Sequence, residues 1–142
     1  MDRKAEARWA GDLKSGAGHL KLGSGAFEGP YSFISRFESG AGTNPEELIG
    51  AAHAGCFSMQ LASSLASAGY PATSVSTTAT VHLTKGEKGF SISGIDLATH
   101  GIVPRISEAE FKRMAEDAKA NCIISRALAA VPMTLDARLE NA

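Results

Sequence analysis

The residues best suited to chemistry are the two cysteines of the chain, Cys56 and Cys122. Cys56 has small neighbours, Ala54 and Gly55, which leave room beside a thiol for another backbone or a substrate. Cys122 follows Asn121, a residue favoured at helix N-caps, so free N–H groups nearby would favour its thiolate. Each could instead be a buried thiol acting as a small hydrophobe. Two cysteines that meet in space would form a redox couple, and their sequence separation leaves open whether they meet.

A cation and a carboxylate could assist a thiol. Arg36 lies in YSFISRF (31–37), whose period-two pattern predicts a strand with the aromatics on one face and Arg36 on the other. A guanidinium near Cys56 would lower the pKa of that thiol and orient a peroxide oxygen. Glu46 could hold Arg36 in a bidentate pair. Alternatively, Arg36 could be a surface arginine at a strand end, and Glu46 could be an acid in the first turn of a helix that the helix dipole stabilises.

The spacing of Glu46 and Cys56 suggests a second chain. If one straight helix carries both residues, the ten positions between them correspond to about 15 Å of helix rise. A single arginine hardly bridges that span, unless the helix starts later than predicted. We therefore expect Arg36 and Glu46 to serve Cys56 of a partner chain, in a two-fold dimer whose long helices pack antiparallel.

Other motifs are weaker. The four histidines, His19, His53, His82 and His100, lack metal-ligand spacing, so no metal site is predicted. His53, three residues before Cys56, could be read as the base of a Cys–His hydrolase, although residues so spaced on one helix rarely present nucleophile and base correctly. The glycine-rich stretch GSGAFEG lacks the lysine of a phosphate-binding loop.

The chain pattern predicts an α+β fold with a mainly antiparallel sheet. Alternation predicts strands at 4–9, near 18–22 and at 31–37, then a hairpin of 75–84 and 90–98 and a last strand within 131–139. Asn44, Pro45 and Glu47 are typical of a helix start, and Gly69 of its stop. The apolar residues of that helix cover most of its circumference, which predicts burial on nearly all sides. Ser107 and Glu110 predict a second helix that breaks near Asn121 and restarts over 123–128.

Composition limits the class of protein. A length of 142 residues with 44% hydrophobic content predicts one domain over 1–142. The net charge of −1 and the absence of a Lys/Arg run argue against nucleic acid or an anionic membrane as a partner. No signal peptide or transmembrane segment is predicted. Two cysteines without a secretory signal favour a reducing compartment, and we expect the cytoplasm.

Taken together, these segments resemble the OsmC/Ohr family of thiol peroxidases over almost the whole chain. RFESGAGTNPEELIGAAHAGCFSM (36–59) is similar to the family's arginine, helix start and first cysteine, and KANCIISRAL (119–128) to its second cysteine. ARWAGDLKSGAG (7–18) and AAHAGCFSM look more like the osmotically inducible OsmC branch than the organic hydroperoxide resistance branch. Ile123 departs from the proline that often follows the second cysteine.

The resemblance implies a fold and residue roles. The fold would be an intertwined homodimer with sheets around two long central helices and active sites at the interface. By position, Cys56 would be the peroxidatic cysteine, Cys122 the resolving cysteine, Arg36 the activating arginine and Glu46 its partner.

We therefore predict a metal-free, cofactor-free peroxidase acting on organic hydroperoxides, and on hydrogen peroxide less efficiently, in oxidative or osmotic stress defence. A Cys56 sulfenic acid and a Cys56–Cys122 disulfide would carry the reaction, and an external dithiol or lipoylated protein would reduce the disulfide. Phe33, Phe37, Phe57 and Met59 would favour an alkyl or lipid substrate. The alternatives are a non-catalytic dimer binding a ligand in an apolar interface pocket, and the Cys–His hydrolase.

Overall fold

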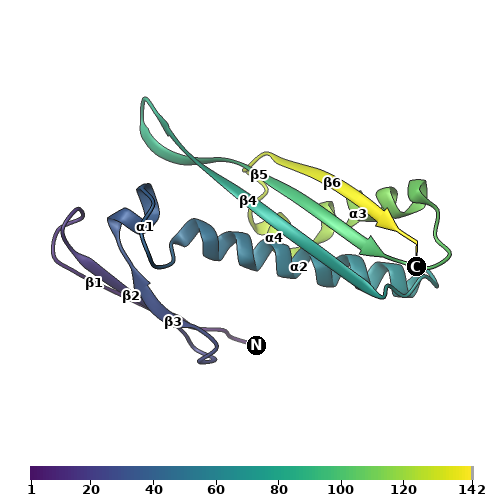
Figure 1. Cartoon of the computed structure of the whole chain (residues 1–142), viewed down its shortest axis with the longest axis horizontal. Helices are drawn as coiled ribbons and strands as arrows, with labels where there is room; N and C mark the ends of the chain where they lie inside the picture. Colours follow the sequence, from purple (N-terminus) through teal and green to yellow (C-terminus); the bar gives the residue numbers. More distant parts are fainter. Residues whose placement is uncertain (142) are drawn as a thin grey trace. The chain divides into compact units, whose positions relative to one another are not determined.

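A computed structural model describes residues 1–141, which fall into two compact units, Met1–Leu48 and a second from Ile49 onward. The elements follow the order β1 (Ala5–Ala10), β2 (Ala17–Leu22), β3 (Glu28–Tyr31), α1 (Phe33–Phe37), α2 (Pro45–Ser67), β4 (Ser74–Gly86), β5 (Gly89–Ile102), α3 (Glu108–Asn121), α4 (Ile123–Ala127) and β6 (Met133–Glu140) (Figure 1). The α+β class is confirmed. One domain over 1–142 stays a prediction.

The first unit contains an antiparallel sheet in the order β1-β2-β3. Gly18 pairs with Trp9 on one side and Tyr31 on the other. A Cβ at this glycine would come within 2.3 Å of the Tyr31 ring. Its absence lets the Trp9 and Tyr31 rings approach, with centroids 5.4 Å apart. These two aromatics form part of the cavity described below.

The predicted strand over 31–37 is wrong, because β3 ends at Tyr31 and Phe33–Phe37 is the short helix α1. Ser32 caps this helix: its hydroxyl accepts from the Ser35 N–H, and the Ser35 hydroxyl accepts from the Ser32 N–H. These reciprocal side-chain to backbone bonds stabilise the first turn of a helix. Here they prevail over the alternating pattern of side chains that predicted a strand. Phe33 and Phe37, which alternate on a strand, also stack one turn apart on a helix, with ring centroids 4.9 Å apart.

Helix α2 starts and ends where the sequence predicts. The Asn44 side chain accepts from the Glu47 N–H at 2.8 Å, and Pro45 occupies the first helical position. At the other end Gly69 has φ 86°, a conformation that favours glycine, and the Tyr70 N–H donates to the Leu65 carbonyl. These caps fix the register of the helix that carries Cys56.

The second unit contains the sheet β4-β5-β6. β4 and β5 form the predicted hairpin, longer than expected and joined through Glu87 and Lys88. β6 returns parallel to β5 after the crossover through α3 and α4 (Figure 1). Across the two sheets the pairing is therefore mainly antiparallel, with one parallel pair.

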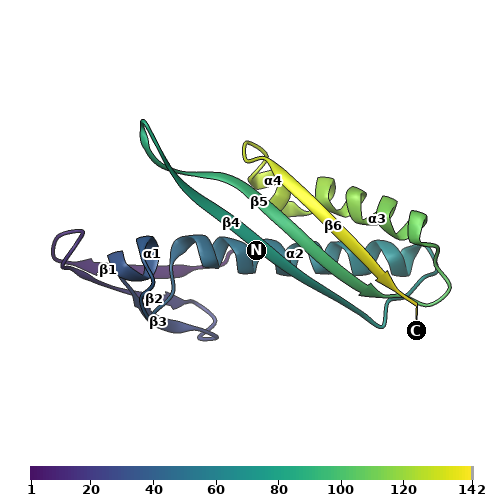
Figure 2. The same ribbon diagram turned by 45° about the horizontal axis from the view of Figure 1, so that its top comes forward.

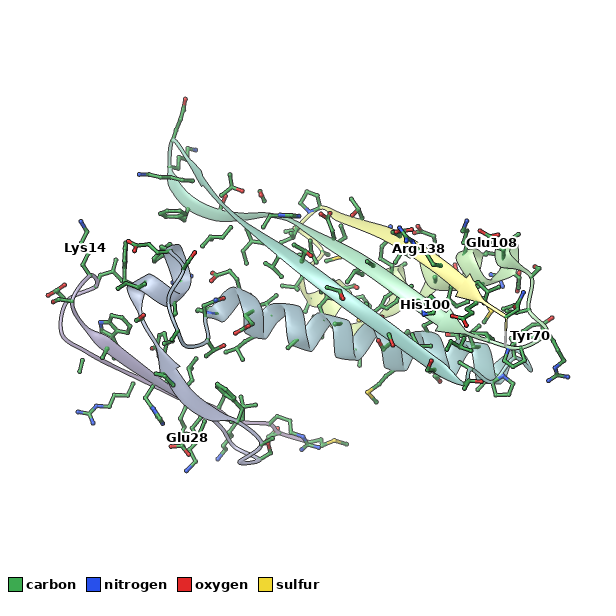
Figure 3. The ribbon with its side chains drawn as sticks, viewed as in Figure 1. Lys14, Glu28, Tyr70, His100, Glu108 and Arg138 are labelled. Carbon is green, nitrogen blue, oxygen red and sulfur yellow. The ribbon has the colours of Figure 1, made fainter. Side chains whose placement is uncertain are left out.

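Helices cover one face of this sheet. Figure 2 shows α3 and the part of α2 from Ile49 onward alongside the strands. Their apolar side chains form one core with β5 and β6, which includes Phe57, Leu61, Leu65, Ile95, Leu97, Phe111, Met114, Ala118 and Ala137. The opposite face is exposed and polar. There His100 and Arg138, paired on β5 and β6, project from adjacent strands (Figure 3).

Burial of α2 on nearly all sides is wrong for a single chain. A stripe of exposed residues follows the helix at spacings of three and four: Ala52, Gly55, Met59, Ser63 and Ala66. The Met59 side chain is the largest of them and is 76% exposed. Small side chains flatten this stripe, so it would accept another helix at close range.

Helix α3 breaks into α4 at a cysteine. The Ser107 hydroxyl caps α3 by accepting from the Glu110 N–H at 3.2 Å, as predicted. Cys122 is both the C-cap of α3 and the N-cap of α4. Asn121, predicted to cap α4, is instead the last residue of α3, and its amide donates to the Asp117 carbonyl. The cysteine itself occupies the junction.

Candidate active site

The two cysteines meet within the second unit. Helix α2 carries Cys56, and the α3–α4 junction carries Cys122. The sulfur atoms lie 2.8 Å apart and are joined by a hydrogen bond, with both cysteines free. A disulfide has an S–S bond of about 2.05 Å, so a small approach of the two sulfurs would bring them to bonding distance. The contact that the sequence left open is therefore present.

Access distinguishes the two thiols. Cys122 is 0% exposed and belongs to the core, whereas Cys56 is partly exposed. Cys56 lines an open, mainly apolar hollow of about 530 Å³, bordered by Met59, Gln60, Ser63, Ile123 and Ile124. A molecule from solution would meet the Cys56 sulfur first.

The electrostatic surroundings of the sulfurs differ. Burial raises the pKa of Cys56, and its hydrogen bond with Cys122 adds to the increase, although the N–H groups of Ile124 and Ile123 oppose it. Burial also acts to raise the pKa of Cys122, but the hydrogen bond with Cys56 and the N–H and hydroxyl of Ser125 lower it overall. In a single chain, burial and the neighbouring thiol thus act together to raise the pKa of Cys56.

A buried histidine and serine lie beside the thiols. His53, on α2, is 0% exposed, and its Nε2 lies 2.7 Å from the Ser125 hydroxyl oxygen of α4. Burial lowers the pKa of His53, so its ring is neutral at pH 7. The Cys–His hydrolase alternative needs the histidine to bond Cys56, and His53 bonds Ser125 instead. Ser125 was not identified from the sequence. Its position three residues after Cys122, the cysteine that caps α4, could have indicated that it belongs to the site.

Arg36 and Glu46 pair within the first unit, as predicted. The Arg36 Nη2 lies 2.8 Å from Glu46 Oε1, and its Nε lies 3.2 Å from Oε2, which gives a bidentate ion pair. The Glu46 residue is 8% exposed. A carboxylate this well covered holds the guanidinium in a fixed orientation and leaves its remaining N–H donors for another group.

An aromatic cavity adjoins Arg36. Its volume is about 460 Å³, and its lining comprises Trp9, Gly11, Leu13, Tyr31, Ser32, Phe33, Arg36 and Phe37. Phe33 and Phe37 thus surround a guanidinium, as expected for a site that takes an apolar molecule with a polar end. Phe57 is different: it is fully buried in the core of the second unit, so its predicted contact with a substrate is wrong. Met59, in contrast, borders the hollow at Cys56.

Within residues 1–141, no group of three or more His, Cys, Asp and Glu side chains is placed to hold a metal ion. In the same residues, no helix combines the length and apolarity needed to cross a membrane. His19, His82 and His100 instead pair singly with Glu28, Asp96 and Glu140 at exposed positions.

The site thus brings together two thiols, one partly exposed on a long helix and one buried at a helix junction, within an α+β fold. The profile of the family described as OsmC-like protein matches residues 38–136. Over 142 residues, the chain is 46% identical to proteins named peroxiredoxin OsmC from Escherichia coli K12 and Shigella flexneri, with 99% of both chains covered in each case. The chain belongs to the OsmC-like family.

Solved structures share the fold. The crystal structure of the organic hydroperoxide resistance protein OhrB of Bacillus subtilis matches with a TM-score of 0.72 at 21% identity, covering 96% of this chain and 98% of that one. An OsmC-like protein of Vibrio cholerae matches with a TM-score of 0.76 at 19% identity, covering 96% and 99%. At these identities the likeness describes the fold.

Proposed function

We propose that the protein is a cysteine-based peroxidase that reduces organic hydroperoxides, and hydrogen peroxide less efficiently, in defence against oxidative or osmotic stress. The observation that carries this proposal is the 2.8 Å contact between an accessible and a buried thiol. The membership of the chain in the OsmC-like family and the peroxiredoxin name of its relatives support it.

The reaction begins at Cys56. Its thiolate attacks the distal peroxide oxygen, the O–O bond breaks, and the alkoxide leaves as an alcohol after taking a proton. The oxidised sulfur is then a sulfenic acid. Cys122 attacks this sulfur, which forms the disulfide and expels hydroxide as water. An external dithiol, free or as a lipoylated protein, returns both thiols by exchange.

Arg36 has two roles in this proposal. Burial raises the pKa of Cys56, so the thiol needs a nearby cation to ionise at neutral pH. The Arg36 guanidinium would supply that cation and stabilise the charge that develops on the leaving oxygen, while Glu46 fixes its orientation. The aromatic cavity beside Arg36 would take the organic part of the hydroperoxide.

Homodimerisation would bring the two sets of residues together. Glu46 and Cys56 are separated by about 15 Å of rise along α2. We infer that Arg36 and Glu46 of one chain serve Cys56 of its partner, with the α2 stripe of Ala52, Gly55 and Met59 packed against the partner's stripe. We further propose that the enzyme acts in the cytoplasm, a reducing compartment in which disulfides are usually transient and catalytic.

The two-cysteine mechanism is tested by adding one equivalent of cumene hydroperoxide to the reduced protein. We expect rapid appearance of a peptide pair linked through Cys56 and Cys122 when digests are analysed by mass without reductant. Omission of the hydroperoxide is the control. Two intact thiols after long exposure would contradict the proposal and leave both cysteines as packing residues.

The shared site is tested by mixing two inactive variants. Chains with Cys56→Ser keep Arg36, and chains with Arg36→Met keep Cys56. After unfolding and refolding together, we expect about a quarter of wild-type activity, because half of the randomly paired dimers carry one complete site out of two. Each variant refolded alone is the control. A mixture no more active than its components, or a monomeric mass by light scattering, would exclude a site shared between chains.

A further inference from the structure

The proposed reaction gives no role to the buried pair His53 and Ser125. The His53 Nε2 and the Ser125 Oγ lie 2.7 Å apart, and the two residues are 0% and 5% exposed. Burial of two hydrogen-bonding side chains in an apolar core is costly unless they serve each other or a further group. The pair joins α2, which carries Cys56, to α4, which begins at Cys122.

Ser125 lies on the helical turn that begins at Cys122. Cys122 is the N-cap of α4, and Ser125 is the third residue of that helix. An N-cap side chain lies over the first turn of its helix, where the N–H and side chain of the third helical residue are also found. The hydroxyl and N–H of Ser125 accordingly contribute to the lowered pKa of Cys122.

The tautomer of His53 determines the direction of the hydrogen bond. Among residues 1–141, the His53 Nδ1 is buried without a hydrogen-bond partner. A buried N–H without a partner is rarer than an under-satisfied acceptor, which favours a bare Nδ1 and a protonated Nε2. The Nε2–H then donates to the Ser125 oxygen, which leaves the Ser125 hydroxyl proton available for another acceptor.

We propose that Ser125 donates a hydrogen bond to the reacting sulfur of Cys122, and that His53 is the positioning residue that orients the Ser125 hydroxyl. This role rests on the proposed two-cysteine function. When Cys122 attacks, its sulfur is oxidised and loses its proton, the S–O bond of the sulfenic acid breaks, and the oxygen leaves with the electron pair and becomes water. A hydrogen bond to the Cys122 thiolate lowers the cost of that proton loss.

The first test needs no peroxide. In a Cys56→Ser background Cys122 is the sole cysteine, and its ultraviolet thiolate absorbance gives its pKa. We expect Ser125→Ala to raise this pKa by about one unit, as the loss of one hydrogen bond to a charged group predicts. Ser125→Thr, which keeps the hydroxyl, should restore the value. His53→Phe should act like Ser125→Ala, whereas His53→Gln retains an N–H donor and should stay near the parent.

The second test separates the steps of the reaction in proteins with both cysteines. Rapid mixing with a hydroperoxide should give a fast phase of Cys56 oxidation and a slower phase of disulfide formation. Ser125→Ala should leave the rate of the fast phase within about twofold of the parent. It should slow the second phase by about three- to fourfold, less than the tenfold loss of thiolate that one pKa unit implies, because a more basic thiolate is also more nucleophilic. Ser58→Ala is the matched control, since it removes a part-buried hydroxyl of α2 that bonds Thr77 on β4.

The outcomes are distinguishable. If Ser125→Ala leaves both the Cys122 pKa and the rate of disulfide formation unchanged, the role of Ser125 is overturned. If His53→Gln and His53→Phe have equal effects, the role of His53 is overturned. Absence of the fast phase in every protein would refute the peroxidase function instead, and the thiolate titration would still decide whether Ser125 acts on Cys122. If His53→Phe fails to fold, the test is the comparison of Ser125→Ala with Ser125→Thr in the Cys122 pKa and the rate of disulfide formation.

Discussion

Cys56→Ser is expected to abolish hydroperoxide turnover, with a loss of roughly three orders of magnitude or more, because a serine hydroxyl neither ionises near neutral pH nor forms a sulfenic acid. The oxygen fits the space of the sulfur, so the core around Phe57 and Leu61 stays intact. Consumption of cumene hydroperoxide with a dithiol as reductant measures the loss.

A matched control accompanies this variant. Ser58→Ala changes a nearby residue of α2 whose hydroxyl bonds Thr77. Ser58 lines neither the hollow at Cys56 nor the aromatic cavity at Arg36. It should retain activity within about twofold, as expected for a residue outside the reacting groups. Cys56→Ser protein with more than a few per cent of wild-type turnover would show that another group reduces the peroxide.

Cys122→Ser is expected to leave the first oxidation intact and to stop the normal cycle. Cys56 remains accessible through its hollow, so one equivalent of hydroperoxide should yield about one equivalent of alcohol. Without the thiol 2.8 Å away, the sulfenic acid has no internal partner. It should accumulate and then advance to sulfinic acid under excess peroxide.

Mass measurement of the intact protein distinguishes the products of this variant. The sulfenic and sulfinic forms of Cys56 add one and two oxygen atoms, whereas the wild type should lose two hydrogen atoms as its disulfide forms. A sulfenic-acid trap should label the Cys122→Ser protein and spare the wild type. Dithiol-supported turnover equal to wild type would remove Cys122 from the mechanism.

Local signals predicted the elements that carry the thiols. Asn44, Pro45 and Gly69 set the ends of α2 because caps act through neighbouring backbone groups. The break at Cys122 was likewise visible in the sequence, although the capping residue was misplaced by one position. The pairing of Arg36 with Glu46 was one of the interpretations that the sequence allowed, and the ion pair confirms it.

Other features depend on contacts that no local pattern encodes. The segment with Phe33 and Phe37 fits alternation and helical spacing equally well, and the bonds of Ser32 and Ser35 decide for a helix. Ala52 and Met59 of the exposed stripe of α2 were predicted to be buried because they are apolar, and apolarity does not separate a core from an interface. The bond between His53 and Ser125 joins residues 72 positions apart.

The contact between Cys56 and Cys122 also bears on how the enzyme withstands a burst of oxidant. A second peroxide molecule must diffuse to the sulfenic acid, whereas the Cys122 sulfur already lies 2.8 Å from Cys56. Well-oriented groups within one molecule react as if present at effective molarities of about 10⁵ M or more. No cellular peroxide concentration competes with that value. The geometry thus favours a scavenger that keeps working at high peroxide over a sensor that is silenced by it.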